Sequence, residues 1–243
     1  MKFGEFLNKA FFYLSVPKCV CCRERLLVDE LAFCDACIKT AGESMASICP
    51  VCLKETRLCL CKNKHLDSHF VKGHIKLYKY ADKDFSAPYD AAIYSIKRAE
   101  RDDIFKLLAR ELADAVRGHG IKLDGTVITN IPRRKSAIVR FGTDHAKLLA
   151  ERVAEELSIE YAELLRSTAK TAQKSLKGEE RIANTEFSVF READLSGRRV
   201  IILDDVVTTG ASMGSAATFI RSMGAKEIYA LSVGYAYKEK IKG

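Results

Sequence analysis

The stretch from Val200 to Ser212 combines carboxylates, hydroxyls and a glycine in the pattern of a ligand-binding turn. Its first four residues are branched and apolar, which predicts a buried strand that ends at Asp204 and Asp205. A helix is expected to begin near Met213, and the free N–H groups and positive dipole of a helix start favour a phosphate. Ligands bind at the C-terminal ends of parallel strands, and aspartates accept hydrogen bonds from a sugar diol. A phosphorylated ribose is therefore the expected ligand.

The turn supplies the expected phosphate contacts. Gly210 allows the backbone to approach a ligand closely, and the neighbouring hydroxyls can donate hydrogen bonds. The expected ligand-binding residues are Asp204, Asp205, Val206, Val207, Thr208, Thr209, Gly210, Ala211 and Ser212. Two alternatives are an ordinary strand, turn and helix with solvated aspartates, and a Walker B strand. The second is weak because the chain has no Gly-x-x-x-x-Gly-Lys-Ser/Thr phosphate loop.

The cysteines form a second motif with chemical potential. All nine lie between Cys19 and Cys61, and eight of them form the close pairs Cys19 and Cys22, Cys34 and Cys37, Cys49 and Cys52, and Cys59 and Cys61. Each pair can fill half of a tetrahedral zinc shell, so the spacing predicts two four-thiolate sites. Folding of this short segment would then be coupled to metal binding. Sequential and interleaved sharing of the pairs both remain open.

Other uses of the cysteines fit less well. Disulfides suit secreted proteins, and a thioredoxin-like site needs one motif in a βαβ unit rather than four in series. Cys21 is left over; it could replace Cys22 in the first pair, but the two-residue spacer of Cys22 is commoner. His65 and His69 lie close enough in sequence to replace a cysteine ligand, and we leave both out of the predicted sites.

Apolar periodicity predicts strands and helices on either side of these motifs. Besides Val200–Leu203, strands are expected within 70–80, 126–131 and 228–233. Helices are expected after Pro88 (with an apolar face over 104–116), over 146–157 and after Met213, the last with Gly224 at its left-handed C-cap. The predicted fold class is α/β, with helices flanking a mostly parallel sheet. A small N-terminal zinc-binding module is expected at residues 1–65 and a larger domain at 66–243.

The stretch from Val200 to Ser212 resembles the phosphoribosyl-pyrophosphate (PRPP) signature of type I phosphoribosyltransferases. With the cysteine pairs upstream, the whole chain resembles the ComF family of competence proteins. The resemblance implies a type I phosphoribosyltransferase-like fold, a zinc-binding segment at the cysteines, and PRPP with Mg²⁺ as the ligand. Lys97 matches a lysine that ComF-like chains carry before a helix; an exposed lysine in a basic turn is the alternative.

The resemblance also assigns two basic segments. Arg133, Arg134 and Lys135 follow the predicted strand 126–131, where phosphoribosyltransferases place a loop that meets pyrophosphate; a solvent-facing basic turn is the alternative. The polar stretch 166–186 corresponds to a mobile loop that closes over the substrates and keeps water from an oxocarbenium-like ribosyl centre. Its candidate residues are Lys170, Gln173, Lys174 and Arg181. A flexible surface loop is the alternative interpretation of that stretch.

The chain departs from the family pattern at one place. ComF-like proteins usually show Arg-Gly-Phe-Asn-Gln-Ala before the helix at 146–157, whereas this chain reads Phe141-Gly142-Thr143-Asp144-His145-Ala146. The acceptor substrate, and transferase activity itself, therefore stay open. We interpret His145 as a polar residue at a helix N-terminus rather than as an acid–base group.

The net charge and the N-terminal residues further limit the ligands and the location that we expect for this protein. The net charge is +8 and the pI is near 9.0, which favours polyanionic ligands. Residues 2–15 are predicted to form an amphipathic packing helix; a signal peptide fits less well because Glu5 interrupts its positive region. No apolar run approaches the roughly 20 residues that span a bilayer, and we expect a cytoplasmic protein.

Three functions fit these observations. The first is a phosphoribosyltransferase or PRPP binder that uses Mg²⁺. The second, implied by the ComF resemblance, is a competence factor in DNA uptake that handles single-stranded DNA with a helicase-like ATPase as partner. The third is a non-catalytic PRPP sensor that acts as an adaptor for such a partner. The first and second can both be true of one chain.

Overall fold

The computed structural model describes residues 17–27, 30–80, 87–98, 101–168, 187–190 and 193–236. Its centre is a five-stranded sheet in the order β1-β7-β6-β2-β3, and all neighbouring strands in it are parallel. The strands are β1 (Val71–Lys79), β7 (Glu227–Tyr235), β6 (Arg199–Val207), β2 (Thr126–Asn130) and β3 (Glu160–Tyr161). The predicted α/β fold class is confirmed.

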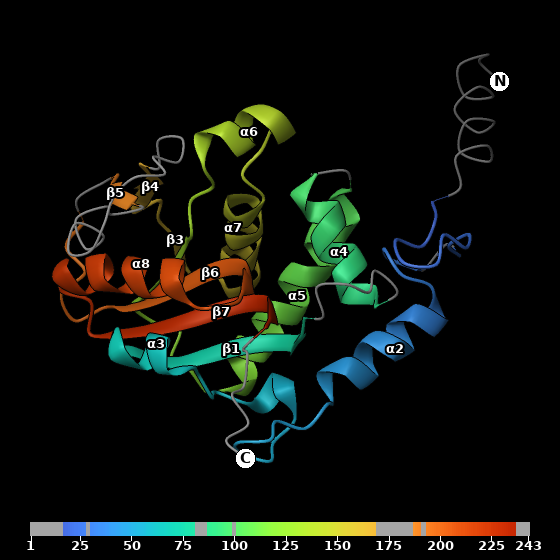
Figure 1. The fold of residues 1–243 in the computed structure, drawn as a ribbon, viewed down its shortest axis with the longest axis horizontal. Helices are drawn as coiled ribbons and strands as arrows, with labels where there is room; N and C mark the ends of the chain where they lie inside the picture. Colours follow the sequence, from blue (N-terminus) through green and yellow to red (C-terminus); the bar gives the residue numbers. More distant parts are fainter. Residues whose placement is uncertain are drawn as a thin grey trace, which may run out of the picture.

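Helices cover both faces of the sheet because successive strand residues point to opposite sides. In β6, Val200 and Ile202 belong to the core under α8, while Ile201 and Leu203 belong to the core on the other face. The first face carries α3 (Lys64–Ser68) and α8 (Ala211–Ser222), and the second carries α4 (Pro88–Lys97), α5 (Asp102–Gly118) and α7 (His145–Leu157). Figure 1 shows α3 and α8 in front of the sheet, with α5 and α7 behind it.

The strand order reverses between β2 and β6. From β2 the chain crosses through α7 to β3 on one side, and from β6 it crosses through α8 to β7 on the other. Such a reversal opens a crevice at the carboxyl ends of the two strands, where ligands bind in open α/β sheets. The predicted ligand residues lie in the last part of β6 and just after it, and the predicted basic residues follow β2, so the fold brings both to this crevice.

Several short elements lie outside the predicted set, β3 and α3 among them. Another is α6 (Lys135–Phe141), which buries none of its side chains and therefore has no apolar period that could predict it. Two more are β4 (Leu165–Ser167) and β5 (Phe187–Val189), which pair antiparallel. These two strands frame the sequence expected to be a mobile loop.

The cysteine-rich segment packs directly on the rest of the protein. It contains α2 (Asp35–Met45) and the 3₁₀ turn η1 (Thr56–Leu58), and α2 lies against α4 and β1. The Phe33 ring meets the Tyr89 ring edge-on at 6.5 Å between centroids, and both side chains are buried in one core. The predicted helix at residues 2–15 lies outside the described residues. Within the described part of the chain, no helix has the length and apolar character to cross a membrane.

Candidate functional site

A loop of residues 208–210 joins β6 to α8 at the carboxyl edge of the sheet; together with the adjoining ends of the strand and the helix, over residues 206–212, we call it the β6–α8 loop. Gly210 caps α8 in a left-handed conformation, with φ of 78°, which favours glycine. A cavity of about 60 Å³ lies here, lined by Asp204, the β6–α8 loop and Met213. The helix begins at Ala211, two residues before the predicted start. Backbone N–H groups and threonine hydroxyls thus surround a space of the size of a phosphate group.

Two of the predicted turn residues belong to the strand. Val206 and Val207 lie in β6 and pair with Gly234 and Tyr235 of β7. The Val206 amide donates to the carboxylate of Asp205 at 2.7 Å, so this amide is already bonded within the protein at the end of the strand. The free turn is therefore shorter than predicted, because the strand continues past the aspartates.

Asp205 is the centre of a buried charge cluster. Its Oδ2 accepts hydrogen bonds from Lys97 Nζ at 2.9 Å and from His145 Nε2 at 3.2 Å. Burial alone would raise the pKa of Asp205, but the bonds from His145 and the charge of Lys97 outweigh it and hold that pKa below its ordinary value. Burial lowers the pKa of Lys97, and the Asp205 charge overcomes this and raises it. Both groups are thereby charged at neutral pH.

Asp204 differs from its neighbour. It lines the loop cavity, and its Oδ1 accepts a hydrogen bond from the Asp205 amide at 2.9 Å. Burial and the negative charge of Asp205 raise its pKa well above the ordinary value. The two adjacent carboxyls are thus shifted in opposite directions, and Asp204 is the one that faces the ligand cavity.

His145 is a site residue that sequence reasoning missed. It is the first residue of α7, as expected, but its side chain is buried and bonded to Asp205. Its Nδ1 has no hydrogen-bond partner among the described residues. The available signal was its place after β2, because neighbouring parallel strands end at one edge of a sheet.

Arg133 is engaged by the protein itself. Its guanidinium donates to the carbonyls of Lys97 (3.1 Å) and Thr143 (3.0 Å) and lies 4.7 Å from the centre of the Phe141 ring. These contacts tie the end of α4 to the segment before α7. Arg134 and Lys135 are exposed and lie at the start of α6, a helix that buries none of its side chains.

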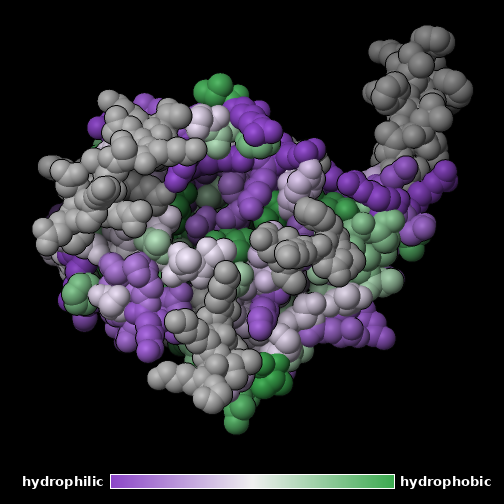
Figure 2. All heavy atoms as spheres, in the orientation of Figure 1, coloured by the Kyte–Doolittle hydropathy of each residue, from purple (hydrophilic) through white to green (hydrophobic). Residues whose placement is uncertain are grey.

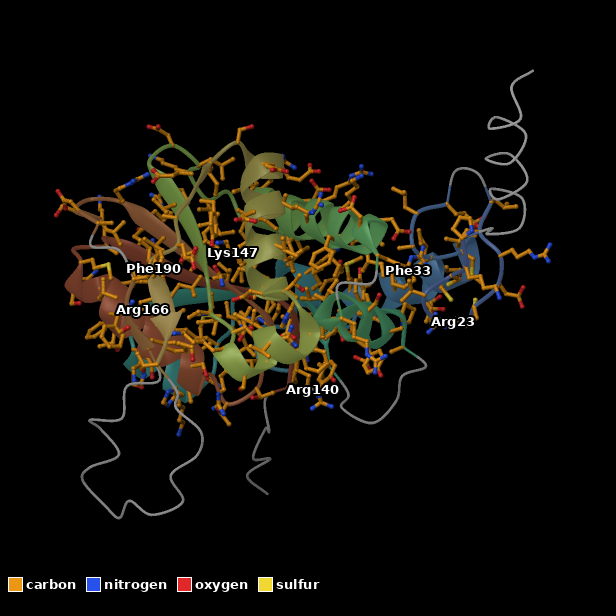
Figure 3. The ribbon with its side chains drawn as sticks, turned by 90° about the horizontal axis from the view of Figure 1, so that it is seen from above. Arg23, Phe33, Arg140, Lys147, Arg166 and Phe190 are labelled. Atoms are coloured by element: carbon orange, nitrogen blue, oxygen red, sulfur yellow. The ribbon has the colours of Figure 1, made fainter. Side chains whose placement is uncertain are left out.

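The surface around this edge is polar. Figure 2 shows a hollow beneath α6 that is bordered mainly by hydrophilic residues. The predicted mobile-loop residues Lys170, Gln173, Lys174 and Arg181 lie outside the described residues. Their framing strands β4 and β5, with Arg166 and Phe190, lie at the opposite end of the molecule from Arg23 and Phe33 of the cysteine-rich segment (Figure 3).

The cysteines gather in two clusters of four. Within each, the sulfur atoms all lie within 4.8 Å of one another; the members are Cys19, Cys22, Cys34 and Cys37 in the first cluster, and Cys49, Cys52, Cys59 and Cys61 in the second. Sharing is therefore sequential, and Cys21 lies outside both sets. Four sulfur donors are the ligand set of a structural zinc site, so either cluster could hold a zinc ion.

The chain is similar in sequence to several known proteins. A sequence model of the family described as "Phosphoribosyl transferase domain" matches residues 144–236. The chain is 26% identical to the DNA utilization protein YhgH of Escherichia coli O157:H7, over 88% of this chain and 96% of that protein. It is also 26% identical to Competence protein F of Haemophilus influenzae, over 87% of this chain and 93% of that protein. Among solved structures, glutamine PRPP amidotransferase from B. subtilis is 19% identical with a TM-score of 0.40, over 58% of this chain and 30% of that one.

Proposed function

We propose that this chain, a ComF-like protein with a phosphoribosyl transferase domain, binds PRPP with Mg²⁺ at the carboxyl edge of its sheet. The observation that carries the proposal is the small cavity of the β6–α8 loop beside Asp204, at the reversal of strand order. The loop amides with Thr208, Thr209 and Ser212 suit the 5-phosphate. Asp204 and Asp205 suit the ribose hydroxyls.

The neighbouring elements supply the pyrophosphate side of the proposed site. Arg134 and Lys135 lie directly after β2, at the start of the unburied helix α6, and their side chains can reach a polyanion. Arg133 acts through its bond to the Lys97 carbonyl and positions the end of α4. When bound with PRPP, Mg²⁺ would neutralise pyrophosphate charge. Lys170, Gln173, Lys174 and Arg181 are proposed to belong to the lid that covers the ligand.

Lys97 and His145 complete the site by holding Asp205. Both donate to the same carboxylate oxygen, so they keep it charged and fixed in orientation before a ligand arrives. An acceptor that is already charged and immobile needs no reorganisation on binding. We assign Lys97 and His145 as positioning residues for the ribose end.

The binding proposal is tested with Asp204→Asn, which keeps the shape of the side chain and replaces one carboxyl oxygen by an amide nitrogen. Calorimetric titration with PRPP and Mg²⁺ should show affinity reduced at least about ten-fold, because an acceptor for a ligand hydroxyl is lost. Asp124→Asn, at an aspartate just before β2, is the matched control and should bind as the unmodified chain does. Equal affinity in both variants would remove Asp204 from the site.

The biological role that we propose is DNA uptake for natural transformation. The similar proteins named for DNA utilization and competence support it, as does the net charge of +8. The proposed polymer is single-stranded DNA, the proposed partner a helicase-like competence ATPase, and the proposed compartment the cytoplasm, where reduced thiols can hold zinc. Titration with single-stranded DNA should show affinity whose logarithm falls linearly with the logarithm of salt concentration. Absence of binding at low salt would contradict this role.

A second candidate is a PRPP sensor without transferase activity. The altered segment 141–146 favours it, because His145 is committed to Asp205 instead of facing an acceptor. A screen for pyrophosphate release from PRPP, with nucleobases and amines offered as acceptors, distinguishes a phosphoribosyltransferase from a sensor. Release with any acceptor identifies a phosphoribosyltransferase, and binding without release supports the sensor.

The cysteine-rich segment has a proposed structural role. We assign one zinc ion to each cluster and a module boundary near residue 65, where the second cluster has ended and α3 has begun. Metal analysis of the purified chain should give two zinc ions.

A further inference from the structure

The second cysteine cluster lies beside the ligand edge, whereas the first does not. Its last ligand, Cys61, is followed directly by Lys62, Asn63 and helix α3. Helix α3 packs on α8, the helix that begins at the β6–α8 loop. Figure 1 shows α3 close to α8, while α2 of the first cluster lies at the far side of the molecule.

Asn63 joins this segment to the β6–α8 loop with a bond at each end of its amide. Its Oδ1 accepts from the Leu66 amide at 2.9 Å and so caps α3. Its Nδ2 donates to the Thr209 carbonyl at 2.9 Å, across 146 residues of sequence. Thr209 is in the loop that lines the ligand cavity. One side chain therefore fixes both the start of α3 and the carbonyl of the loop.

Apolar packing reinforces the same contact. Leu66 is fully buried, in one core with Met213 and Ala217 of α8. A Cβ atom on Gly210 would lie 3.1 Å from the Leu66 side chain, a tight contact, and the positive φ there also favours glycine. The loop thus rests on α3 in van der Waals contact.

A buried lysine ties the second cluster to the sheet. Lys76 of β1 is 1% exposed, and its Nζ donates to the carbonyls of Cys59 (3.1 Å) and Cys61 (2.8 Å) and lies 3.4 Å from Cys59 Sγ. A buried ammonium needs compensating negative charge. Four thiolates with one divalent cation carry a net negative charge and supply it, so this environment fits an occupied metal site.

We propose that the Cys49–Cys61 cluster, acting through Asn63 and Leu66, positions the β6–α8 loop, so that metal occupancy of this cluster sets affinity for the phosphorylated ligand. The inference rests on the proposed function for the identity of that ligand, but the clamp itself is a property of the free protein. Asn63 and Leu66 are positioning residues. The first cluster is joined through α2 to α4 and β1, and the contacts described here do not connect it to the β6–α8 loop.

The clamp is tested with Asn63→Ser and hydrogen exchange in the absence of ligand. Serine retains an oxygen that can cap α3 and lacks a donor that reaches Thr209. We expect amides of the β6–α8 loop to exchange about five-fold faster, with thermal stability nearly unchanged. Ser68→Ala, at the other end of α3, removes a hydroxyl bonded to the His65 carbonyl and should leave the loop amides unchanged. Unchanged loop exchange in Asn63→Ser would overturn the clamp.

The role of the metal is tested with one cysteine from each cluster. Cys52→Ser should lower the zinc content by one ion, speed exchange of the β6–α8 loop and weaken PRPP binding about five-fold or more. Cys22→Ser should also lose one ion and leave exchange of the β6–α8 loop unchanged. Equal effects of the two variants on the loop would contradict the proposal. If Cys52→Ser does not fold, hydrogen exchange of the unmodified chain before and after zinc removal by a chelator replaces it, and unchanged exchange of the β6–α8 loop would contradict the proposal.

The two proposals fail separately. An unmodified chain that does not bind PRPP contradicts the proposed function, and the exchange experiment still reports on the clamp. A chain that binds PRPP equally well with and without the Asn63 amide contradicts the clamp and leaves the proposed function intact.

Discussion

The two halves of the ligand edge are built in different ways. The β6–α8 loop is held by backbone geometry and apolar contact, with Gly210 against Leu66 and a neutral amide bond from Asn63. The other half is a cluster of charges, in which Lys97 and His145 hold Asp205. The first half is fixed by shape, and the second by electrostatics.

Because of this difference, pH and salt should affect the contacts around Asp205 and have little effect on the contacts of the β6–α8 loop. Apolar contact and neutral hydrogen bonds do not titrate, so the contacts of Gly210 and Asn63 do not change with pH as long as the second cysteine cluster is intact. The charge cluster exists only while Asp205 is ionised and Lys97 is protonated. Variants of each half therefore have distinct signatures.

The largest effect is expected from Gly210→Val. A β-branched residue at positive φ is strained, and its side chain would enter the space of Leu66. Together these effects cost about 3 kcal/mol of unfolding free energy, and PRPP binding should be lost. Gly125→Val is the matched control, because Gly125 also has positive φ (66°) but a Cβ atom added to it would meet nothing within 4 Å. Denaturant unfolding should give a clearly smaller cost for the control, at every pH; similar costs would contradict the packing argument.

A smaller, pH-dependent effect is expected from Lys97→Met. It removes a charge partner of buried Asp205 and should cost about 2 kcal/mol at neutral pH, since His145 remains. The folded-state pKa of Asp205 is lowered, so its stabilising contribution is present above the unfolded pKa of about 4 and is lost as pH falls through the folded-state value.

The contribution of Lys97 to stability depends on pH in the opposite direction from that of Asp205. Its folded-state pKa is raised, so its contribution is present below the unfolded pKa of about 10.4 and is lost as pH rises above it. The free energies of unfolding of the unmodified chain and of Lys97→Met can be measured with urea between neutral pH and about pH 3. The difference between these two free energies should become smaller as the pH falls. A difference that stays constant with pH would show that Lys97 acts through packing alone.

The smallest effect is expected from Asp204→Asn, which should stabilise the protein where the two preceding substitutions destabilise it. The folded-state pKa of Asp204 is raised, so the unmodified chain loses stability as pH rises through the unfolded pKa of about 4. Asparagine removes this cost and should raise stability by about 1 kcal/mol at neutral pH, as substitutions at strained functional sites often do. Thermal unfolding should show the gain vanishing below about pH 4. Destabilisation at neutral pH would show that the carboxylate is needed for folding as well as for the ligand.

Local pattern in the sequence predicted part of the fold. The strand from Val200 and the helix after Gly210 follow from apolar runs and turn residues within a short distance of one another. The eight cysteines that were paired by their spacing are the ones that gather in the two clusters, because that spacing is local. Their sequential sharing was not predictable, since it depends on how the knuckles meet in space.

The sequence did not predict the contacts between distant segments. His145 and Asn63 are ordinary polar residues at helix starts, and each gains its place in the site from a partner far along the chain. The exposed helix α6 was missed for a different reason, because it buries no side chain and so has no apolar period. Phosphate loops can be recognised locally, whereas the groups that hold them depend on tertiary structure.

The strand order has a consequence for the way in which the chain folds. Strand β1 joins the sheet only through β7, the last of the described strands to be synthesised, and His74 bonds to Ser232 across 158 residues. Contacts of such long range form late, because a long loop must first be closed. On the ribosome the cysteine knuckles can fold early from local contacts, while β1 must wait for β7. The ligand site is then completed last, when segments from distant parts of the chain meet beside it.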